Sequence, residues 1–202
     1  MSDISHLSRR YDRAANRWQA KMDRFGFGPA YRHMLGQVAL PARPLVALDA
    51  GTGCGTFAGA ALDFGLSFAQ LDLLDPSARM LAHASEMVGA RAPLRCFAKD
   101  IASHEPAACY DLILCAHVVE HCADPVATLA QLRAMLAPGG TLLLAVSKPH
   151  WCSLIVFLRW RHRCFEPAEM RGLLARAGFE TTRGHPFPSG VPSRVSHGYC
   201  AN

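Results

Sequence analysis

A short apolar run followed at once by alternating glycines constrains the fold of this chain more than any other feature. The run LVALD covers residues 45–49, and Gly51, Gly53 and Gly55 follow it in AGTGCGT. An uninterrupted apolar run of this length is typical of a parallel strand buried on both faces. Glycines let the backbone turn tightly and approach a ligand, with the N–H groups of the following helix pointing at it. The pattern predicts a central strand, a binding loop and a helix.

Strand and helix patterns alternate through the middle of the chain. Similar apolar runs recur at 68–74, 110–115 and 141–146, with a weaker one at 94–98. Helical patterns separate them at about 55–65, 76–88 and 124–136, where Asp124 and Pro125 suit the N-cap and first position of a helix. This alternation predicts a doubly wound, Rossmann-like α/β fold with a mostly parallel sheet and helices on both faces.

The two ends of the chain differ from this middle part. A helix is expected at 3–24, a break at 25–29 and a second helix from Pro29 to about Leu40. Beyond Pro149 we expect an irregular segment, a helix at about 167–177 and strands near 179–184 and 194–200. The expected organisation is one domain over residues 1–202: a helical cap (1–43), a core (44–148), and a lid with C-terminal strands (149–202).

Length and composition exclude several classes of protein. The chain has 202 residues, of which 50% are hydrophobic and 18% charged, as expected of one globular domain. No apolar run approaches the ~18 residues of a membrane-spanning helix, and the N-terminal MSDISHLSRR does not resemble a signal peptide. We therefore expect a cytoplasmic protein. The eight cysteines include no C-x-x-C pair, which favours reduced thiols over a zinc site or a disulfide scaffold.

The charge is unevenly distributed along the chain. The net charge of +5 combines basic segments at 1–44 and 148–202 with an acidic segment at 45–147. Basic ends folded over a core would attract an anionic metabolite, an anionic membrane surface or nucleic acid, whereas solvated helix faces are the simpler interpretation.

The glycine spacing separates two classes of cofactor site. A dinucleotide loop, G-x-G-x-x-G, would place its third glycine at position 56, where this chain has Thr56. The G-x-G-x-G spacing resembles motif I of the class I S-adenosylmethionine (SAM)-dependent methyltransferases. Further segments agree with that family in the right order: LDLLDPSARML, Lys99-Asp100-Ile101, YDLILCAHVVEHCADP, LAPGGTLLLAV and RCFEPAEMRGLLARAGFE.

This resemblance implies a seven-stranded sheet with an antiparallel last strand, SAM as cofactor and S-adenosylhomocysteine as product. It implies that Asp75 accepts the ribose hydroxyls, that Met80 packs near the adenine, and that Asp100 accepts from the adenine amino group. The full set implied to bind the cofactor is Tyr11, Trp18, Asp49, Gly51, Thr52, Gly53, Cys54, Gly55, Asp75, Pro76, Met80, Asp100, Ile101, Cys115, Ala116 and His117.

The residues after the fourth strand indicate which branch of the methyltransferase family this chain resembles. Cys115-Ala116-His117-Val118 replaces both the [D/N/S]-P-P-[Y/F] tetrapeptide of amino-methylating enzymes and the Pro-Cys of cytosine enzymes. YDRAANRWQ is similar to the opening helix of several small-molecule enzymes, including the quinone and phospholipid methyltransferases. We therefore expect methyl transfer to a small anionic or amphipathic metabolite, with no nucleic-acid partner.

Candidate catalytic groups lie at the end of the fourth strand. His117, Glu120 and His121 are there, and an imidazole can accept a proton near neutral pH. Alternatively His117 only lines the cavity and His121 caps the loop. H-V-V-E-H also matches a zinc-protease motif, but it directly follows a buried strand, so no metal is expected. Candidate substrate-binding residues are Tyr31, His150, Trp151, Arg159 and Arg161.

The segment WCSLIVFLRWRHRCF, residues 151–165, admits several interpretations. Its apolar octet followed by arginines suits a lid over an apolar or anionic substrate, a homodimer face or core packing, or peripheral contact of residues 151–163 with an anionic membrane. Two other functions stay open for the whole chain. They are a non-catalytic SAM-binding protein and, against the Thr56 spacing, an NAD-type oxidoreductase.

Overall fold

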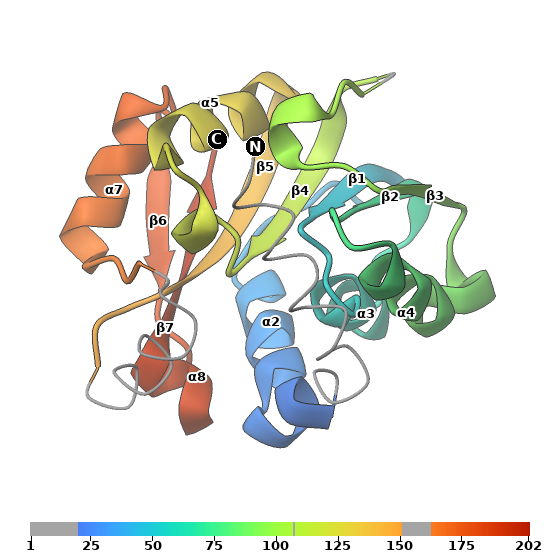
Figure 1. The fold of residues 1–202 in the computed structure, drawn as a ribbon, viewed down its shortest axis with the longest axis horizontal. Helices are drawn as coiled ribbons and strands as arrows, with labels where there is room; N and C mark the ends of the chain where they lie inside the picture. The colour runs from blue at the N-terminus through green and yellow to red at the C-terminus, as the bar shows by residue number, and fades with distance from the viewer. Residues whose placement is uncertain (1–19, 107, 151–162) are drawn as a thin grey trace.

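A seven-stranded sheet forms the centre of the molecule, in a computed structural model that describes residues 20–106, 108–150 and 163–202. The strands are β1 Leu45–Ala50, β2 Phe68–Leu74, β3 Leu94–Phe97, β4 Tyr110–Ala116, β5 Leu136–Ser147, β6 Thr182–His185 and β7 Ser196–Ala201. Their order is β3-β2-β1-β4-β5-β7-β6 (Figure 1). β1 to β5 pair in parallel, and β7 is antiparallel to both β5 and β6. The predicted fold class is confirmed.

Helices cover both faces of the sheet. They are α2 Phe27–Leu35, α3 Thr56–Asp63, α4 Ala78–Val88, α5 Pro125–Ala134, α7 Pro167–Arg176 and α8 Gly190–Val195. Single 3-10 turns are η1 Gly89–Arg91, η2 Ile101–Ser103 and η3 Val119–His121. Figure 1 shows α2, α3 and α4 in the lower half of the view and α5 and α7 at the upper left. Among the described residues, no helix has the length and apolar character needed to cross a membrane.

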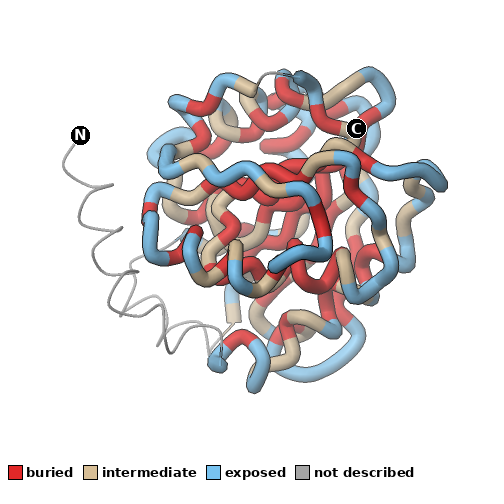
Figure 2. The backbone as a smooth tube through the Cα atoms, turned by 90° about the vertical axis from the view of Figure 1, so that its right-hand side faces the viewer, coloured by how far each residue is buried: buried red, intermediate tan, exposed pale blue. Residues whose placement is uncertain are grey.

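Each strand divides its apolar side chains between two cores because successive residues point to opposite faces. Ala47 of β1 and Leu112 of β4 pack with α2, α3 and α4, whereas Leu48 and Ile113 pack with α5 and α7. The buried positions are concentrated in the centre of the fold (Figure 2). Burial on both faces explains why the sequence of the central strands is continuously apolar rather than alternating.

Several element boundaries differ from those predicted. The second helix spans 27–35 instead of 29–40, because Gly26 with φ 78° starts it and Gly36 ends it. Pro29 lies in its first turn, where no backbone N–H is needed. β5 begins at Leu136 instead of 141 and includes the Pro-Gly-Gly segment, where the register jumps from Tyr110↔Leu136 to Leu112↔Thr141.

The boundaries near the C-terminus also differ. β6 spans 182–185 instead of 179–184, and β7 begins at Ser196 instead of 194. The short helix α8, with the sequence GVPSRV, was not predicted, since glycine and proline seldom occupy helix interiors.

A buried polar network joins β2, β3 and β4 away from the glycine loop. The side chain of Asp72 is 0% exposed and accepts two hydrogen bonds from Arg95, at 2.8 Å each. The Tyr110 hydroxyl donates to Asp72 at 2.7 Å and lies 3.0 Å from Nε2 of His104. Tyr110 and His104 are both buried; Tyr110 donates directly to this carboxylate, and His104 is connected to it only through the Tyr110 hydroxyl.

Replacing Asp72 should therefore destabilise the fold. Asp72→Asn removes an acceptor and the charge opposite Arg95, so we expect a loss of about 1–3 kcal/mol in the free energy of unfolding, the cost of leaving buried polar groups unsatisfied. Urea denaturation followed by circular dichroism measures it. Asp63→Asn is the matched control: its pair with Arg91 is 51% and 44% exposed, so the loss should stay below about 1 kcal/mol. Equal losses would contradict this assignment.

Candidate active site

The candidate site lies where the carboxyl ends of β1 and β4 meet. β1 pairs with β2 on one side and with β4 on the other, so the chain leaves these neighbouring strands towards opposite faces of the sheet. Such a switch point leaves a crevice beyond the strand ends, where open α/β sheets bind ligands. The glycine loop after β1 and the loop containing η3 after β4 border this position.

Each glycine of the loop has a different local role. The N–H groups of Gly51 and Thr52 both donate to the Leu74 carbonyl, at 2.7 and 3.0 Å, which ties the loop to the end of β2. A Cβ on Gly51 would lie 2.2 Å from Val118 Cγ2, so the loops after β1 and β4 touch here. A Cβ on Gly55 would lie 3.0 Å from Ala84 in α4. At Gly53, by contrast, a Cβ would meet no atom of the described residues within 4 Å, so those residues leave room for a ligand there.

The Asp75 carboxylate lies beside this open position. Its oxygens accept hydrogen bonds from the Gly53 N–H at 3.0 Å and the Ser77 N–H at 2.8 Å. Ser77 in turn caps α4 by accepting from the Met80 N–H at 3.1 Å. The sequence prediction that an acceptor follows β2 next to the glycine loop is consistent with this geometry, whereas its role towards a ribose stays a prediction.

The other residues predicted around an adenine have structural partners of their own. Met80 is buried and its sulfur lies 3.3 Å from the Cys54 sulfur, so Met80 supports the glycine loop from α4. Asp100 caps η2 by accepting from the Ser103 N–H at 2.8 Å. Ile101 is buried, and Pro76 is exposed. Their roles towards a cofactor stay predictions.

Asp49 is a buried carboxyl beneath the glycine loop. It is 2% exposed and accepts from the Thr52 hydroxyl at 2.8 Å and the Ala58 N–H at 3.2 Å. Burial raises the pKa of Asp49 to about 7, although these two hydrogen bonds favour the ionised form. Asp49 therefore links β1, the loop and α3 from inside the fold.

The end of β4 brings His117 and Glu120 together. Nδ1 of His117 lies 3.1 Å from Oε1 of Glu120 and 3.2 Å from the Ser147 hydroxyl. His121 ends η3, and its backbone N–H donates to the Val118 carbonyl at 2.9 Å. Because η3 is a single 3-10 turn, H-V-V-E-H does not form the helix that its zinc-protease interpretation needs.

Helix α2 contributes two aromatic side chains near the candidate site, Tyr31 and Phe27, of which the sequence indicated only Tyr31. Tyr31, a predicted substrate-binding residue, is 1% exposed and its ring stacks on Phe57 at 4.3 Å. Its buried hydroxyl has no hydrogen-bond partner among the described atoms, and burial, followed by the charge of Asp49, raises its pKa. Phe27 presents its ring to His117 at 5.4 Å and 90°, a contact between distant segments for which the sequence held no signal.

The remaining predicted site residues fall into two groups. Cys115 is buried and Ala116 half-buried at the end of β4, while His150 is half-buried just after β5. Burial raises the pKa of the Cys115 thiol, which keeps it protonated and apolar in character. Outside the described residues lie Tyr11, Trp18, Trp151, Arg159 and Arg161.

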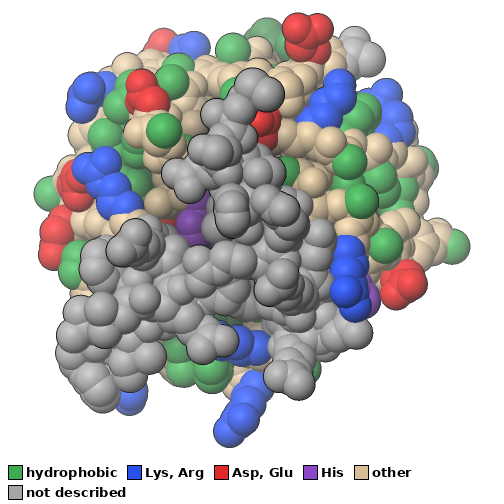
Figure 3. Space-filling view, viewed as in Figure 1, with side chains coloured by type: hydrophobic (Ala, Val, Ile, Leu, Met, Phe, Trp, Pro, Cys, Tyr) green, Lys and Arg blue, Asp and Glu red, His purple; other side chains and the backbone are tan. Residues whose placement is uncertain are grey.

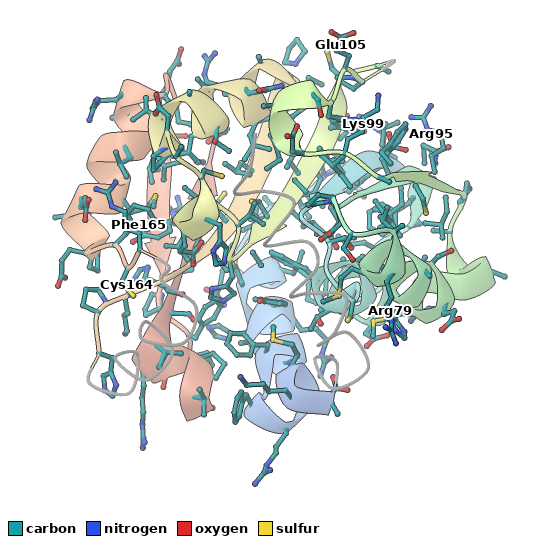
Figure 4. The ribbon with its side chains drawn as sticks, in the orientation of Figure 1. Arg79, Arg95, Lys99, Glu105, Cys164 and Phe165 are labelled. Atoms are coloured by element: carbon teal, nitrogen blue, oxygen red, sulfur yellow. The ribbon has the colours of Figure 1, made fainter. Side chains whose placement is uncertain are left out.

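Charges are mixed over the face that Figure 3 shows, with basic and acidic side chains of the described residues interspersed around its rim. In Figure 4, Arg95 and Lys99 lie towards the β3 side of the molecule, whereas Cys164 and Phe165 lie on the opposite side, below α7. The Phe165 N–H donates to the Ser147 carbonyl at 2.9 Å, which attaches the chain entering α7 to the end of β5. Among the described residues, no group of three His, Cys, Asp or Glu side chains is arranged to hold a metal ion.

The strand order, the glycine loop at the switch point and the carboxylate after β2 together define a methyltransferase domain. A family model described as "Methyltransferase domain" matches residues 9–183. The chain belongs to this family, and the resemblance to class I SAM-dependent methyltransferases is confirmed.

Individual relatives are distant. A ubiquinone biosynthesis O-methyltransferase of Leptothrix cholodnii is 30% identical over 102 residues, which cover 50% of this chain and 43% of that protein. The chain thus spans less than half the length of this curated relative.

Solved structures share the fold over nearly the whole chain. The N-methyltransferase NodS of Bradyrhizobium japonicum, in complex with S-adenosylhomocysteine, superposes with a TM-score of 0.76 at 18% identity, covering 99% of this chain and 98% of that one. The magnesium protoporphyrin IX methyltransferase of Synechocystis, also with S-adenosylhomocysteine bound, gives a TM-score of 0.74 at 18% identity and 99% coverage of both.

The open space at Gly53 yields a test of where the cofactor binds. Gly53→Val should lose S-adenosylhomocysteine binding, because the added side chain would project into space that no atom of the described residues fills; its φ of 53° also strains the backbone, a cost that the control below shares. Isothermal titration calorimetry measures binding, and thermal unfolding monitors the fold. Gly65→Val is the matched control, since Gly65 also has a positive φ and open space around it. Retained binding in Gly53→Val, or equal loss in Gly65→Val, would place the cofactor elsewhere.

The raised pKa of Asp49 predicts a pH dependence of stability. The folded protein keeps this proton up to about pH 7, whereas an unfolded aspartate releases it near about 3.9. The stabilisation is therefore complete below the unfolded pKa and is lost as pH rises through 7. We therefore expect the difference in free energy of unfolding between the wild-type protein and Asp49→Asn to change with pH. Between the unfolded and the folded pKa, the wild-type value should fall relative to the variant by up to about 1.4 kcal/mol per pH unit. Urea titrations at pH 4–9 measure it; a constant difference would contradict the shift.

Proposed function

We propose that this chain transfers a methyl group from SAM to a small anionic or amphipathic metabolite. The observation that carries the proposal is the glycine loop at the switch point, open at Gly53 and bordered there by the Asp75 carboxylate. Membership of the methyltransferase domain family supports the activity. The name of the Leptothrix relative supports a small aromatic or quinone-like acceptor.

The chain's own residues suit what such a reaction requires. SAM supplies an electrophilic methyl group on a sulfonium, with a neutral leaving group. The protein must hold the acceptor in line with the methyl group and keep water out. Asp75 and the N–H groups of the glycine loop offer an acceptor and donors to the cofactor, while the rings of Phe27 and Tyr31 offer an apolar boundary.

The basic ends of the sequence support a negative group on the substrate. Residues 148–202 hold eight Lys or Arg against three acidic residues, and two of the arginines, Arg159 and Arg161, lie in the proposed lid segment. A lid of this composition would recognise an anionic group beside an apolar body.

Calorimetric titration with S-adenosylhomocysteine, with NADH as the control ligand, tests the cofactor. We expect binding of S-adenosylhomocysteine alone. Asp75→Ala should weaken it by about 1–3 kcal/mol, the contribution of hydrogen bonds to a charged acceptor, whereas Asp63→Ala on the exposed side of α3 should leave it unchanged. Unchanged affinity in Asp75→Ala would show that the cofactor is misplaced. A methyl-release screen of anionic and amphipathic metabolites then identifies the substrate.

A further inference from the structure

His117 has an unusual backbone conformation at the end of β4. Its φ of 57° is the one positive φ among the described non-glycine residues, a conformation that costs energy for a residue with a Cβ. The surrounding structure holds it there: its N–H donates to the Ala145 carbonyl of β5 at 2.8 Å. Strain of this kind is concentrated at functional positions, so the direction of the His117 ring calls for an explanation.

The ring of His117 is fixed on both of its edges. Nδ1 lies 3.1 Å from Oε1 of Glu120 and 3.2 Å from the Ser147 hydroxyl. The ring lies perpendicular to that of Phe27, and Nε2 lies 3.5 Å from the Ser196 hydroxyl of β7. The imidazole side chain nonetheless keeps 23% of its surface exposed.

The carboxylate of Glu120 is buried, which is unusual for a charged side chain. Its side chain is 1% exposed; Oε1 accepts from the Ser147 N–H at 2.6 Å, and Oε2 has no partner among the described atoms. Burial raises the pKa of the Glu120 carboxyl, but the bonds to His117 and the Ser147 N–H outweigh it and lower the pKa overall. Glu120 is therefore ionised and can only accept hydrogen bonds.

This arrangement determines the tautomer of His117. A nitrogen at hydrogen-bond distance from a carboxylate must carry the hydrogen, so the neutral ring has its proton on Nδ1. Nε2 is then left with a lone pair. A carboxylate that orients an imidazole in this way is the arrangement by which hydrolase triads prepare a general base.

We propose that Glu120 is a positioning residue that keeps His117 in the Nδ1–H tautomer, and that Nε2 of His117 takes the proton from a hydroxyl acceptor during methyl transfer. The proposal rests on the proposed function and narrows its acceptor to an alcohol or phenol oxygen. An amine can react through its lone pair and a thiolate is already ionised, so neither needs this base.

The step balances as a simple displacement. The acceptor oxygen forms its new bond to the methyl carbon, while the electron pair of the carbon–sulfur bond stays on sulfur. The hydroxyl proton passes to Nε2, which gives an imidazolium beside the Glu120 carboxylate. That carboxylate stabilises the new charge, and the proton then leaves to water.

The tautomer can be measured directly, without cofactor or substrate. Two-bond proton–nitrogen NMR spectra of protein labelled with ¹⁵N-histidine separate the Nδ1–H from the Nε2–H form. The signals of His117 are identified because they are missing from the spectrum of His117→Asn. We expect Nδ1–H in the wild-type protein at pH 8, and a loss of this preference in Glu120→Gln. An Nε2–H tautomer of His117 in the wild-type protein would overturn the proposal. This result comes from the wild-type spectrum alone, so it does not depend on whether Glu120→Gln folds.

The chain contains a matched control for this spectrum. His83 and Glu86 have the same three-residue spacing as His117 and Glu120, but their atoms are 3.9 Å apart and Glu86 is 81% exposed. Glu86→Gln should therefore leave both the tautomer of His83 and that of His117 unchanged. A change at His117 in this variant would show that a general effect of charge, rather than contact with Glu120, sets the tautomer.

Activity tests the acceptor class. On the hydroxyl compound identified by the methyl-release screen, His117→Asn should lower kcat by about 10²–10⁴-fold, the range for loss of a general base, with a much smaller change in KM. Glu120→Gln should lower kcat less. An amine or thiol as the preferred acceptor would overturn the proposal. Failure of S-adenosylhomocysteine to bind would instead refute the proposed function and leave the tautomer measurement standing.

Discussion

The contact between Gly51 and Val118 is the constraint on which the site depends. β1 and β4 are parallel neighbours, so the loops that leave their carboxyl ends must pass each other within a few ångströms. A side chain at position 51 would occupy the place of Val118 Cγ2, and only glycine allows this approach. The same contact brings the glycine loop and the loop holding His117 to one place. The proposed cofactor loop and the proposed base are therefore held together by a close backbone approach rather than by a shared side chain.

Buried carboxylates organise the site from below. Asp49 joins the glycine loop to α3 through Thr52 and Ala58, and Glu120 joins η3 to β5 through the Ser147 N–H. Each is almost inaccessible to solvent, yet their pKa values shift in opposite directions: burial raises the pKa of Asp49, whereas for Glu120 the hydrogen bonds to His117 and the Ser147 N–H outweigh burial and lower it. The same chemical group thus holds its proton up to about pH 7 at one strand end and is an anion there at the next.

Sequence reasoning located the strands well because burial on both faces leaves a strong local signal. LVALD and YDLILC are continuously apolar, and both are central strands. It failed where glycine and proline lie inside a strand or helix. Pro138 and Gly139 lie within β5, which was expected to begin later, and α8, which was not expected, contains Pro192. It placed His117 and Glu120 in the right loop but could not show that they touch. Their contact depends on the positive φ of His117 and on Ser147, 27 residues after Glu120.

This strained conformation also explains how His117 and Glu120 come into contact. Continuing β4 in its extended conformation would carry residue 117 onwards along the sheet, whereas φ 57° turns the chain back so that Glu120 reaches the end of β5. The ring of His117 is then enclosed by Phe27 from α2, Ser147 from β5 and Ser196 from β7. Elements from both ends of the chain thus meet at one imidazole ring. A histidine needed only for packing would not require a carboxylate, since the Ser147 hydroxyl alone can satisfy Nδ1, and the energetic cost of burying Glu120 is better explained by control of the His117 proton.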